Sequence, residues 1–101
     1  MAKKLKGSQR KRLRELAHNM EPLIHIGKRG IPDEVIRQID KVLTDHELIK
    51  IRFNEFKEEK KNLSARIADG TGSELVGMIG HVAILYRENP EKEKKIVLNR
   101  K

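Results

Sequence analysis

The chain has no cysteine and no tryptophan among its 101 residues. Without thiols it has no disulfide framework, no thiolate zinc site and no cysteine nucleophile. Its aromatic side chains are limited to Phe53, Phe56 and Tyr86. The core must therefore be aliphatic, and a sheet surface that reads RNA with several stacked aromatics is disfavoured.

Long hydrophobic runs are also missing. No apolar run approaches the roughly 20 residues that cross a bilayer, and residues 1–19 lack the hydrophobic middle of a secretory signal. We therefore expect a soluble, cytoplasmic, monomeric protein without membrane contact. The Arg-rich, acid-poor N-terminus is also typical of an organellar transit peptide, an alternative weakened by the helical periodicity that follows at once.

Positive charge is abundant but unevenly placed. The formal net charge is +8. Residues 1–14 contain seven lysines and arginines and no acid, whereas residues 15–86 contain ten basic and twelve acidic side chains. A chain of this length forms one domain. We divide it into a basic lead (1–7), a folded domain (8–98) and a short tail (99–101).

Hydrophobic periodicity predicts three helices. The first has an apolar face at i, i+3, i+4 and i+7 and Ser8 as a candidate N-cap. The second follows Pro32 and carries Asp33 and Glu34 in its first turn, where acids suit the helix dipole. The third is assigned from Phe56, Leu63 and Ile67 and should end at Gly70 or Gly72. The first face comprises Leu13, Leu16, Ala17 and Met20, and the second Val35, Ile36, Ile39, Val42 and Leu43.

Four segments are predicted to be strands: 22–26, 47–54, 75–79 and 82–86. Ile96–Leu98 could add an edge strand. The order is thus α-β-α-β-α-β-β in an α/β domain. A strand–helix–strand unit favours parallel neighbours and the short link between the last two strands favours a hairpin, so the four-stranded sheet should be mixed.

The segment Gly27-Lys28-Arg29-Gly30 links the first strand to the second helix. Two glycines three residues apart allow a tight turn with exposed N–H groups, and two cations occupy its tip. This chemistry suits a phosphodiester. Since Asp33 and Glu34 occupy the helix N-terminus, phosphates should bind to loop amides and to the two cations. A second G-x-x-G segment, Gly77–Gly80, lies in an apolar stretch and is interpreted as structural.

The first helix supplies a second group of candidates. Arg10, Lys11 and Arg14 fall on one flank, away from the apolar face, and no acid precedes Glu15. A solvated helix face is the simpler interpretation, but the missing acids favour contact with a polyanion. If this helix packs beside the Gly27–Gly30 loop, both basic groups would form one continuous surface.

Four ordered blocks resemble the CRM domain (chloroplast RNA splicing and ribosome maturation), particularly the stand-alone bacterial YhbY-type proteins. They are Leu-Ala-His at 16–18, Pro-Leu-Ile-His-Ile-Gly-Lys-Arg-Gly at 22–30, His-Glu-Leu-Ile-Lys-Ile at 46–51, and Gly80-His81 with Leu85-Tyr86-Arg87. The resemblance implies a mixed four-stranded sheet with three helices, similar to the C-terminal domain of bacterial translation initiation factor three. It also implies RNA binding through Gly27, Lys28, Arg29 and Gly30, and a role in assembly of the large ribosomal subunit.

Catalytic motifs are not found. The histidines show no H-E-x-x-H spacing, the serines lack a nucleophile elbow, and no Walker or dinucleotide motif occurs. We therefore expect no enzyme activity, no metal and no cofactor. The predicted function is RNA binding in ribosome assembly, with precursor large-subunit ribosomal RNA as partner. The alternative is an adaptor whose basic ends dock on an acidic protein.

Overall fold

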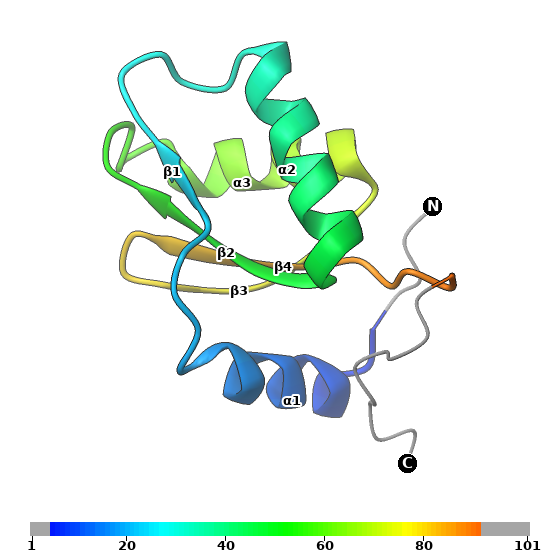
Figure 1. Cartoon of the computed structure of the whole chain (residues 1–101). Coiled ribbons are helices and arrows are strands. Elements are labelled where there is room, and N and C mark those ends of the chain that lie inside the picture. Colours follow the sequence, from blue (N-terminus) through cyan, green and yellow to red (C-terminus); the bar gives the residue numbers. More distant parts are fainter. Residues whose placement is uncertain (1–4, 92–101) are drawn as a thin grey trace.

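The computed structural model describes residues 5–91 and contains three helices and four strands in the predicted order (Figure 1). The candidate strand at Ile96–Leu98 lies outside these residues. The elements are α1 (Gly7–Ala17), β1 (Ile24–Ile26), α2 (Asp33–His46), β2 (Leu48–Phe53), α3 (Lys60–Thr71), β3 (Glu74–Ile79) and β4 (Val82–Tyr86).

The strands form one mixed sheet in the order β1-β2-β4-β3. β1 and β2 are parallel, as expected for strands joined by a helix. β3 and β4 form an antiparallel hairpin, and β4 also pairs antiparallel with β2. The predicted mixed sheet is confirmed. The chain places β4 inside the sheet, so β3 becomes an edge strand.

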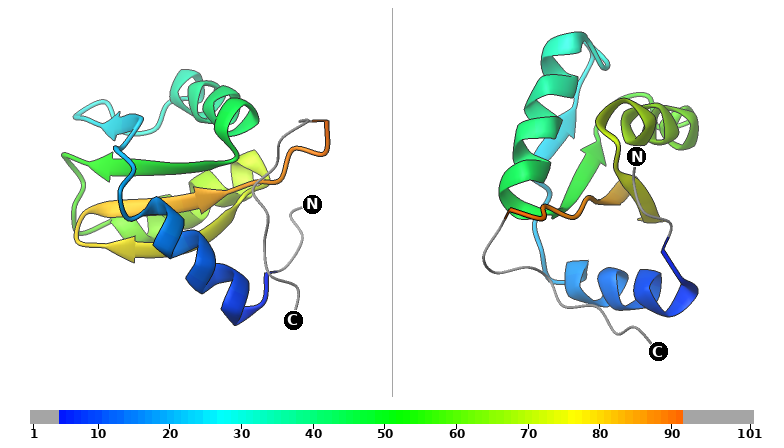
Figure 2. Two further views of the ribbon diagram at one scale, coloured as in Figure 1. Left: turned by 60° about the horizontal axis from the view of Figure 1, so that its bottom comes forward. Right: turned by 90° about the vertical axis from the view of Figure 1, so that its right-hand side faces the viewer.

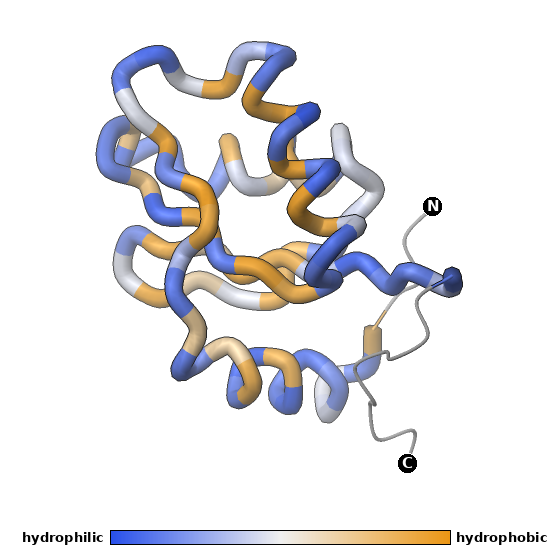
Figure 3. The backbone as a smooth tube through the Cα atoms, viewed as in Figure 1, coloured by the Kyte–Doolittle hydropathy of each residue, from blue (hydrophilic) through white to orange (hydrophobic). Residues whose placement is uncertain are grey.

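α1 covers one face of the sheet, and α2 and α3 cover the other (Figures 1 and 2). Alternate residues of β2 point to opposite faces: Leu48 packs with α1, while Ile49 and Ile51 pack with α2 and α3. The α1 layer is small and includes Leu13, Ala17, Val76, Ile84 and Tyr86. Figure 3 shows the hydrophobic residues concentrated along the strands and the inward sides of the helices.

The start of α1 differs from the prediction. The helix begins at Gly7, with Lys6 at the N-cap position, so Ser8 is already inside the first turn and is not the cap. The Gln9 side chain instead accepts a hydrogen bond from the Lys6 N–H at 2.9 Å. A side chain reaching back from the third helical position satisfies the backbone without a cap serine. The predicted apolar face is confirmed, since Leu13 and Ala17 are buried.

α2 begins directly after Pro32, as predicted, and its apolar face packs on the sheet. α3 ends at Gly72, which adopts a left-handed conformation with φ +66° that glycine tolerates best. The assignment of Phe56 to α3 was wrong, because α3 begins at Lys60. Phe56 precedes the helix and has φ +57°, a conformation that no helix residue adopts. None of the helices in residues 5–91 is long and apolar enough to cross a membrane.

Candidate nucleic-acid interface

The segment Gly27–Gly30 forms a hydrogen-bonded turn between β1 and α2. The Gly30 N–H donates to the Gly27 carbonyl at 3.0 Å, and Gly30 has φ +72°. The backbone itself therefore favours glycine at position 30. Gly27 is different: its φ is not positive, and a Cβ built there meets nothing within 4 Å. No contact within the described chain requires glycine at position 27.

The two cations of this turn are not equivalent. Both residues are exposed, but the Arg29 guanidinium forms an ion pair with Glu34, whose side chain is 55% exposed. Lys28 has no hydrogen bond or ion pair to any residue in the range 5–91. Glu34 therefore does more than occupy the helix N-terminus, because it also neutralises one loop cation. Lys28 is the cation of this turn that is free to meet a phosphate.

Two of the three candidate cations on α1 are bound to the protein. Arg10 pairs with Glu74 and also donates to the Leu75 carbonyl at 2.8 Å. Arg14 donates to the Val76 carbonyl at 3.3 Å. Arg10 is half-buried and Arg14 is exposed, and the contacts of both guanidinium groups with β3 were not predicted from the sequence. Lys11 is exposed, as expected of a binding residue.

Gly77 leaves the space that the Arg14 side chain occupies between α1 and β3. The pairing register of β3 shifts between Leu75 and Gly77, which is a β-bulge. A bulge can turn two successive residues to the same face. Val76 packs in the α1 layer, and a Cβ on Gly77 would lie 2.8 Å from the Cδ of Arg14. Glycine therefore leaves room for the arginine stem, in agreement with the structural interpretation of Gly77–Gly80.

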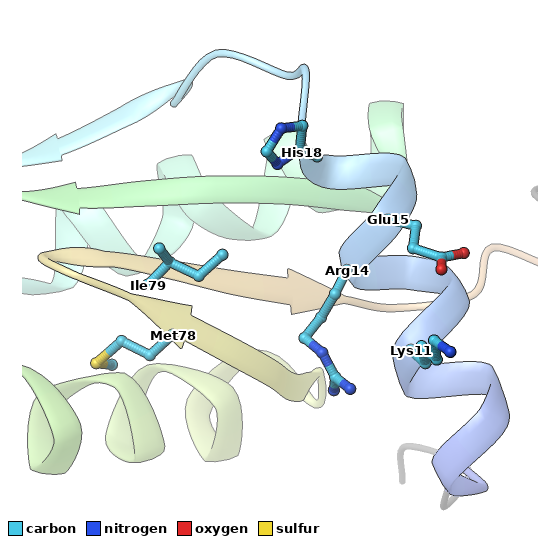
Figure 4. Close-up of a pocket in the computed structure, with 6 residues that line it drawn as sticks. All are labelled: Lys11, Arg14, Glu15, His18, Met78 and Ile79. Carbon is cyan, nitrogen blue, oxygen red and sulfur yellow. The ribbon is translucent and has the colours of Figure 1, made fainter.

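A hollow of about 750 Å³ lies between α1 and the C-terminal end of β3. Figure 4 shows Arg14 and His18 on the side of α1 that faces the strand, while Glu15 points away from it. Ile79 and Met78 project to opposite sides of β3. Since Ile79 is 59% exposed, the hollow is an open depression with an apolar edge and a basic wall.

Sequence analysis missed a pair of basic residues on the α1 face of the sheet. His25 of β1 lies beside Arg52 of β2 in the parallel ladder, and both are exposed. The Arg52 side chain has no hydrogen bond or ion pair with the rest of residues 5–91. The alternation of charged and apolar residues in β2 contained the signal, because it places Lys50 and Arg52 on one face.

The N-terminal helix does not pack beside the Gly27–Gly30 turn, which corrects the hypothesis of a directly continuous surface. All three views place α1 against one face of the sheet and the turn on the side of α2 (Figures 1 and 2). His25 and Arg52 lie at the end of the strands that leads to this turn. Lys50 is occupied, since its Nζ donates to the carbonyls of His18 and Met20.

His81 and Glu47 have contacts within the protein that do not involve the Gly27–Gly30 turn. Lys60 Nζ is 2.5 Å from the Gly80 carbonyl and 3.1 Å from His81 Nδ1. Partial desolvation lowers the pKa of His81, and the charges of Lys60, Lys57 and Arg52 lower it further. The buried Glu47 accepts a hydrogen bond from the Asn89 N–H at 2.7 Å. Within residues 5–91 no group of three metal-binding side chains comes together.

The fold and its exposed basic turn define a small α/β domain with a G-x-x-G turn after its first strand. A family model for the CRS1 / YhbY (CRM) domain matches residues 5–87, and the chain belongs to this family. The resemblance inferred from the four sequence blocks is thus confirmed.

Similar proteins extend over nearly the whole chain. Probable RNA-binding protein YqeI of Bacillus subtilis is 38% identical over 90 residues, covering 88% of this chain and 94% of its own. An RNA-binding protein of Haemophilus influenzae is 37% identical over 98 residues, covering 96% and 97%. The solution structure of the hypothetical protein SAV1595 from Staphylococcus aureus matches with a TM-score of 0.80 and 43% identity, over 95% of this chain and all of that one.

Proposed function

We propose that the protein binds RNA through the Gly27–Gly30 turn. The observation that carries this proposal is the exposed turn itself, in which the Lys28 side chain has no hydrogen bond or ion pair within residues 5–91. An exposed glycine with open space beside it, next to an unpaired lysine side chain, fits a site where a phosphate approaches the backbone closely. Relatives of similar length are named RNA-binding proteins, which supports the same conclusion.

Lys28 is the principal cation at the turn, and Arg29 adds to it when Glu34 releases it. His25 and Arg52 extend the site along the sheet, and Lys11 contributes a more distant charge from α1. Arg10 and Arg14 act mainly by holding α1 on β3, and they add positive potential without a direct contact. The protein acts by binding, without catalysis and without a cofactor.

The biological partner we propose is precursor ribosomal RNA of the large subunit, bound by a cytoplasmic monomer during subunit assembly. This step rests on the family to which the chain belongs. Crosslinking in cells followed by sequencing of the bound RNA tests it. Enrichment of large-subunit precursor sequences is the expected result, and enrichment of messenger RNA alone would exclude the assembly role.

The turn itself is tested by the salt dependence of binding. Lys28→Ala with Arg29→Ala should lower the affinity for a structured ribosomal RNA fragment and reduce the slope of log K against log salt by about one to two units, because each lost phosphate contact contributes about one. Lys41→Ala with Arg66→Ala is the matched control. It removes the same charge from exposed positions of α2 and α3, and should leave the slope nearly unchanged.

Equal losses in both double variants would mean that overall charge, not the turn, governs binding. An unchanged affinity in the Lys28/Arg29 variant would remove the turn from the site. If the wild-type protein prefers an acidic protein to RNA at physiological salt, the adaptor function becomes the better account of its basic surface.

A further inference from the structure

Three loops meet at one end of the sheet. The Ile26 carbonyl accepts hydrogen bonds from the N–H groups of Asn54 and Glu55 at 3.0 and 3.1 Å, which joins the β2–α3 loop to the Gly27–Gly30 turn. The Phe53 N–H donates to the His81 carbonyl at 2.8 Å, which adds the β3–β4 turn. A ligand bound at Gly27–Gly30 therefore lies close to residues of the other two loops.

Phe56 occupies this junction in an unusual state. Its φ is +57°, a conformation that costs a bulky L-residue about 1–2 kcal/mol. The ring packs on the turn, since a Cβ on Gly30 would lie 3.6 Å from its Cε2 and Cζ atoms. Even so, 39% of the residue is exposed to solvent. The fold thus holds an aromatic ring at the surface, beside the proposed phosphate site, instead of burying it.

The charges around Phe56 are mixed. Its own loop, residues 54–59, carries one lysine and three acids (Lys57, Glu55, Glu58 and Glu59), and Lys60 begins the helix that follows. This loop is therefore not a strong polyanion site by itself. An exposed ring suits the flat face of a nucleobase, which is uncharged and stacks on aromatic side chains.

We propose that Phe56 stacks on an unpaired base of the RNA whose phosphates lie at the Gly27–Gly30 turn. This inference rests on the proposed RNA-binding function and specifies its ligand as single-stranded RNA, or a loop or bulge within a folded one. Bases in a regular duplex are already stacked on their neighbours and offer no free face to the ring.

The test compares two probes, a 5′-labelled unstructured RNA of about 12 nucleotides, within the usual size of single-strand sites, and a fully paired RNA duplex of the same length. Phe56→Leu keeps an apolar side chain but removes the ring. It should weaken single-strand binding about 5- to 100-fold, the loss expected when one stacked base loses its aromatic partner. Phe56→Tyr should retain the affinity, and duplex binding should not change in either variant.

The salt slope separates this inference from the proposed function. Phe56→Leu removes no charge, so the affinity should fall at an unchanged slope, whereas Lys28→Ala with Arg29→Ala lowers the slope. Ile79→Ala removes another exposed apolar side chain and should not alter binding. If the lysine–arginine variant loses affinity and Phe56→Leu does not, stacking is excluded while the binding site at the turn stands.

A second variant reports directly on the contact. Because the chain contains no tryptophan, Phe56→Trp introduces a single tryptophan at the junction, which can be excited selectively at wavelengths that tyrosine does not absorb. Stacking predicts that the single-stranded RNA quenches its emission in a saturable manner and that the duplex does not. Equal quenching by both probes, or none by either at saturating RNA, would overturn the inference even if Phe56→Leu proved too unstable to study.

Discussion

The two G-x-x-G segments have the same spacing and different uses. In Gly77–Gly80 the aliphatic part of the Arg14 side chain occupies the space where a Cβ of the first glycine would lie. In Gly27–Gly30 the first glycine faces open space, and the second glycine of both segments has a positive φ, +72° at Gly30 and +58° at Gly80. Spacing alone therefore does not identify a binding loop. The useful difference is whether the chain itself occupies the space that glycine leaves.

The same contrast applies to the cations. Arg10 and Arg14 come from the most basic stretch of the chain, yet they hold α1 against β3. Lys28 comes from a nearly neutral region and has no partner within residues 5–91. A local excess of charge predicts positive potential, but it does not predict which cation remains available for a ligand.

The largest effect, a loss of stability, is expected from reversing the charge of Arg10 and Arg14, the two arginines that contact β3. Arg10→Glu with Arg14→Glu places an acid beside Glu74 at position 10 and removes the hydrogen bonds to the Leu75 and Val76 carbonyls. The free energy of unfolding should fall by about 2–4 kcal/mol, as for loss of charged hydrogen bonds at partly buried sites. Urea unfolding measures it. Wild-type stability in this variant would show that the two arginines do not hold α1 on β3.

Gly77→Val should have the next largest effect. The new side chain would collide with Arg14, whose Cδ lies 2.8 Å from the position of a Cβ. Displacing the arginine from the bulge should cost about 1–3 kcal/mol, typical of overpacking. Thermal and urea unfolding measure the loss. If Gly77→Val and Gly27→Val are equally stable, the distinction between the two segments fails.

Within the Gly27–Gly30 turn, the two glycines should respond differently to alanine. Gly30→Ala should reduce stability by about 1–2 kcal/mol because an L-residue disfavours φ +72°. Gly27→Ala should change stability by less than about 0.5 kcal/mol, as at an unconstrained surface position. Its effect should appear in RNA affinity, as a loss of several-fold. If Gly27→Ala lowers stability and leaves RNA affinity unchanged, Gly27 serves folding and not RNA binding.

The smallest effect concerns pH and reports on the α1 face alone. Burial raises the pKa of Tyr86 to about 12, with help from the charges of Glu47 and Glu88. Because the folded pKa exceeds the unfolded value of about 10, the neutral tyrosine stabilises the fold fully below pH 10, and this contribution is lost as pH rises towards 12. Thermal unfolding should show a decline over this window that Tyr86→Phe lacks. An identical decline in both proteins would assign it to lysine titration.

The sequence by itself determined the elements and most of the candidate turn. Apolar periodicity located α2 and the buried side of α1, Pro32 and Gly72 marked helix ends, and the two short connections specified a parallel pair and a hairpin. These features are local, since they depend on residues within a few positions of one another along the chain.

Only the tertiary structure decided which side chains are available. It inserted β4 between β2 and β3, directed Arg10 and Arg14 onto the edge strand, and paired Arg29 with Glu34. It also excluded Phe56 from α3 and placed its ring on the Gly30 turn. Most of these contacts join residues far apart in sequence, so no local pattern encodes them. They depend on how the two helix layers close over opposite faces of the sheet.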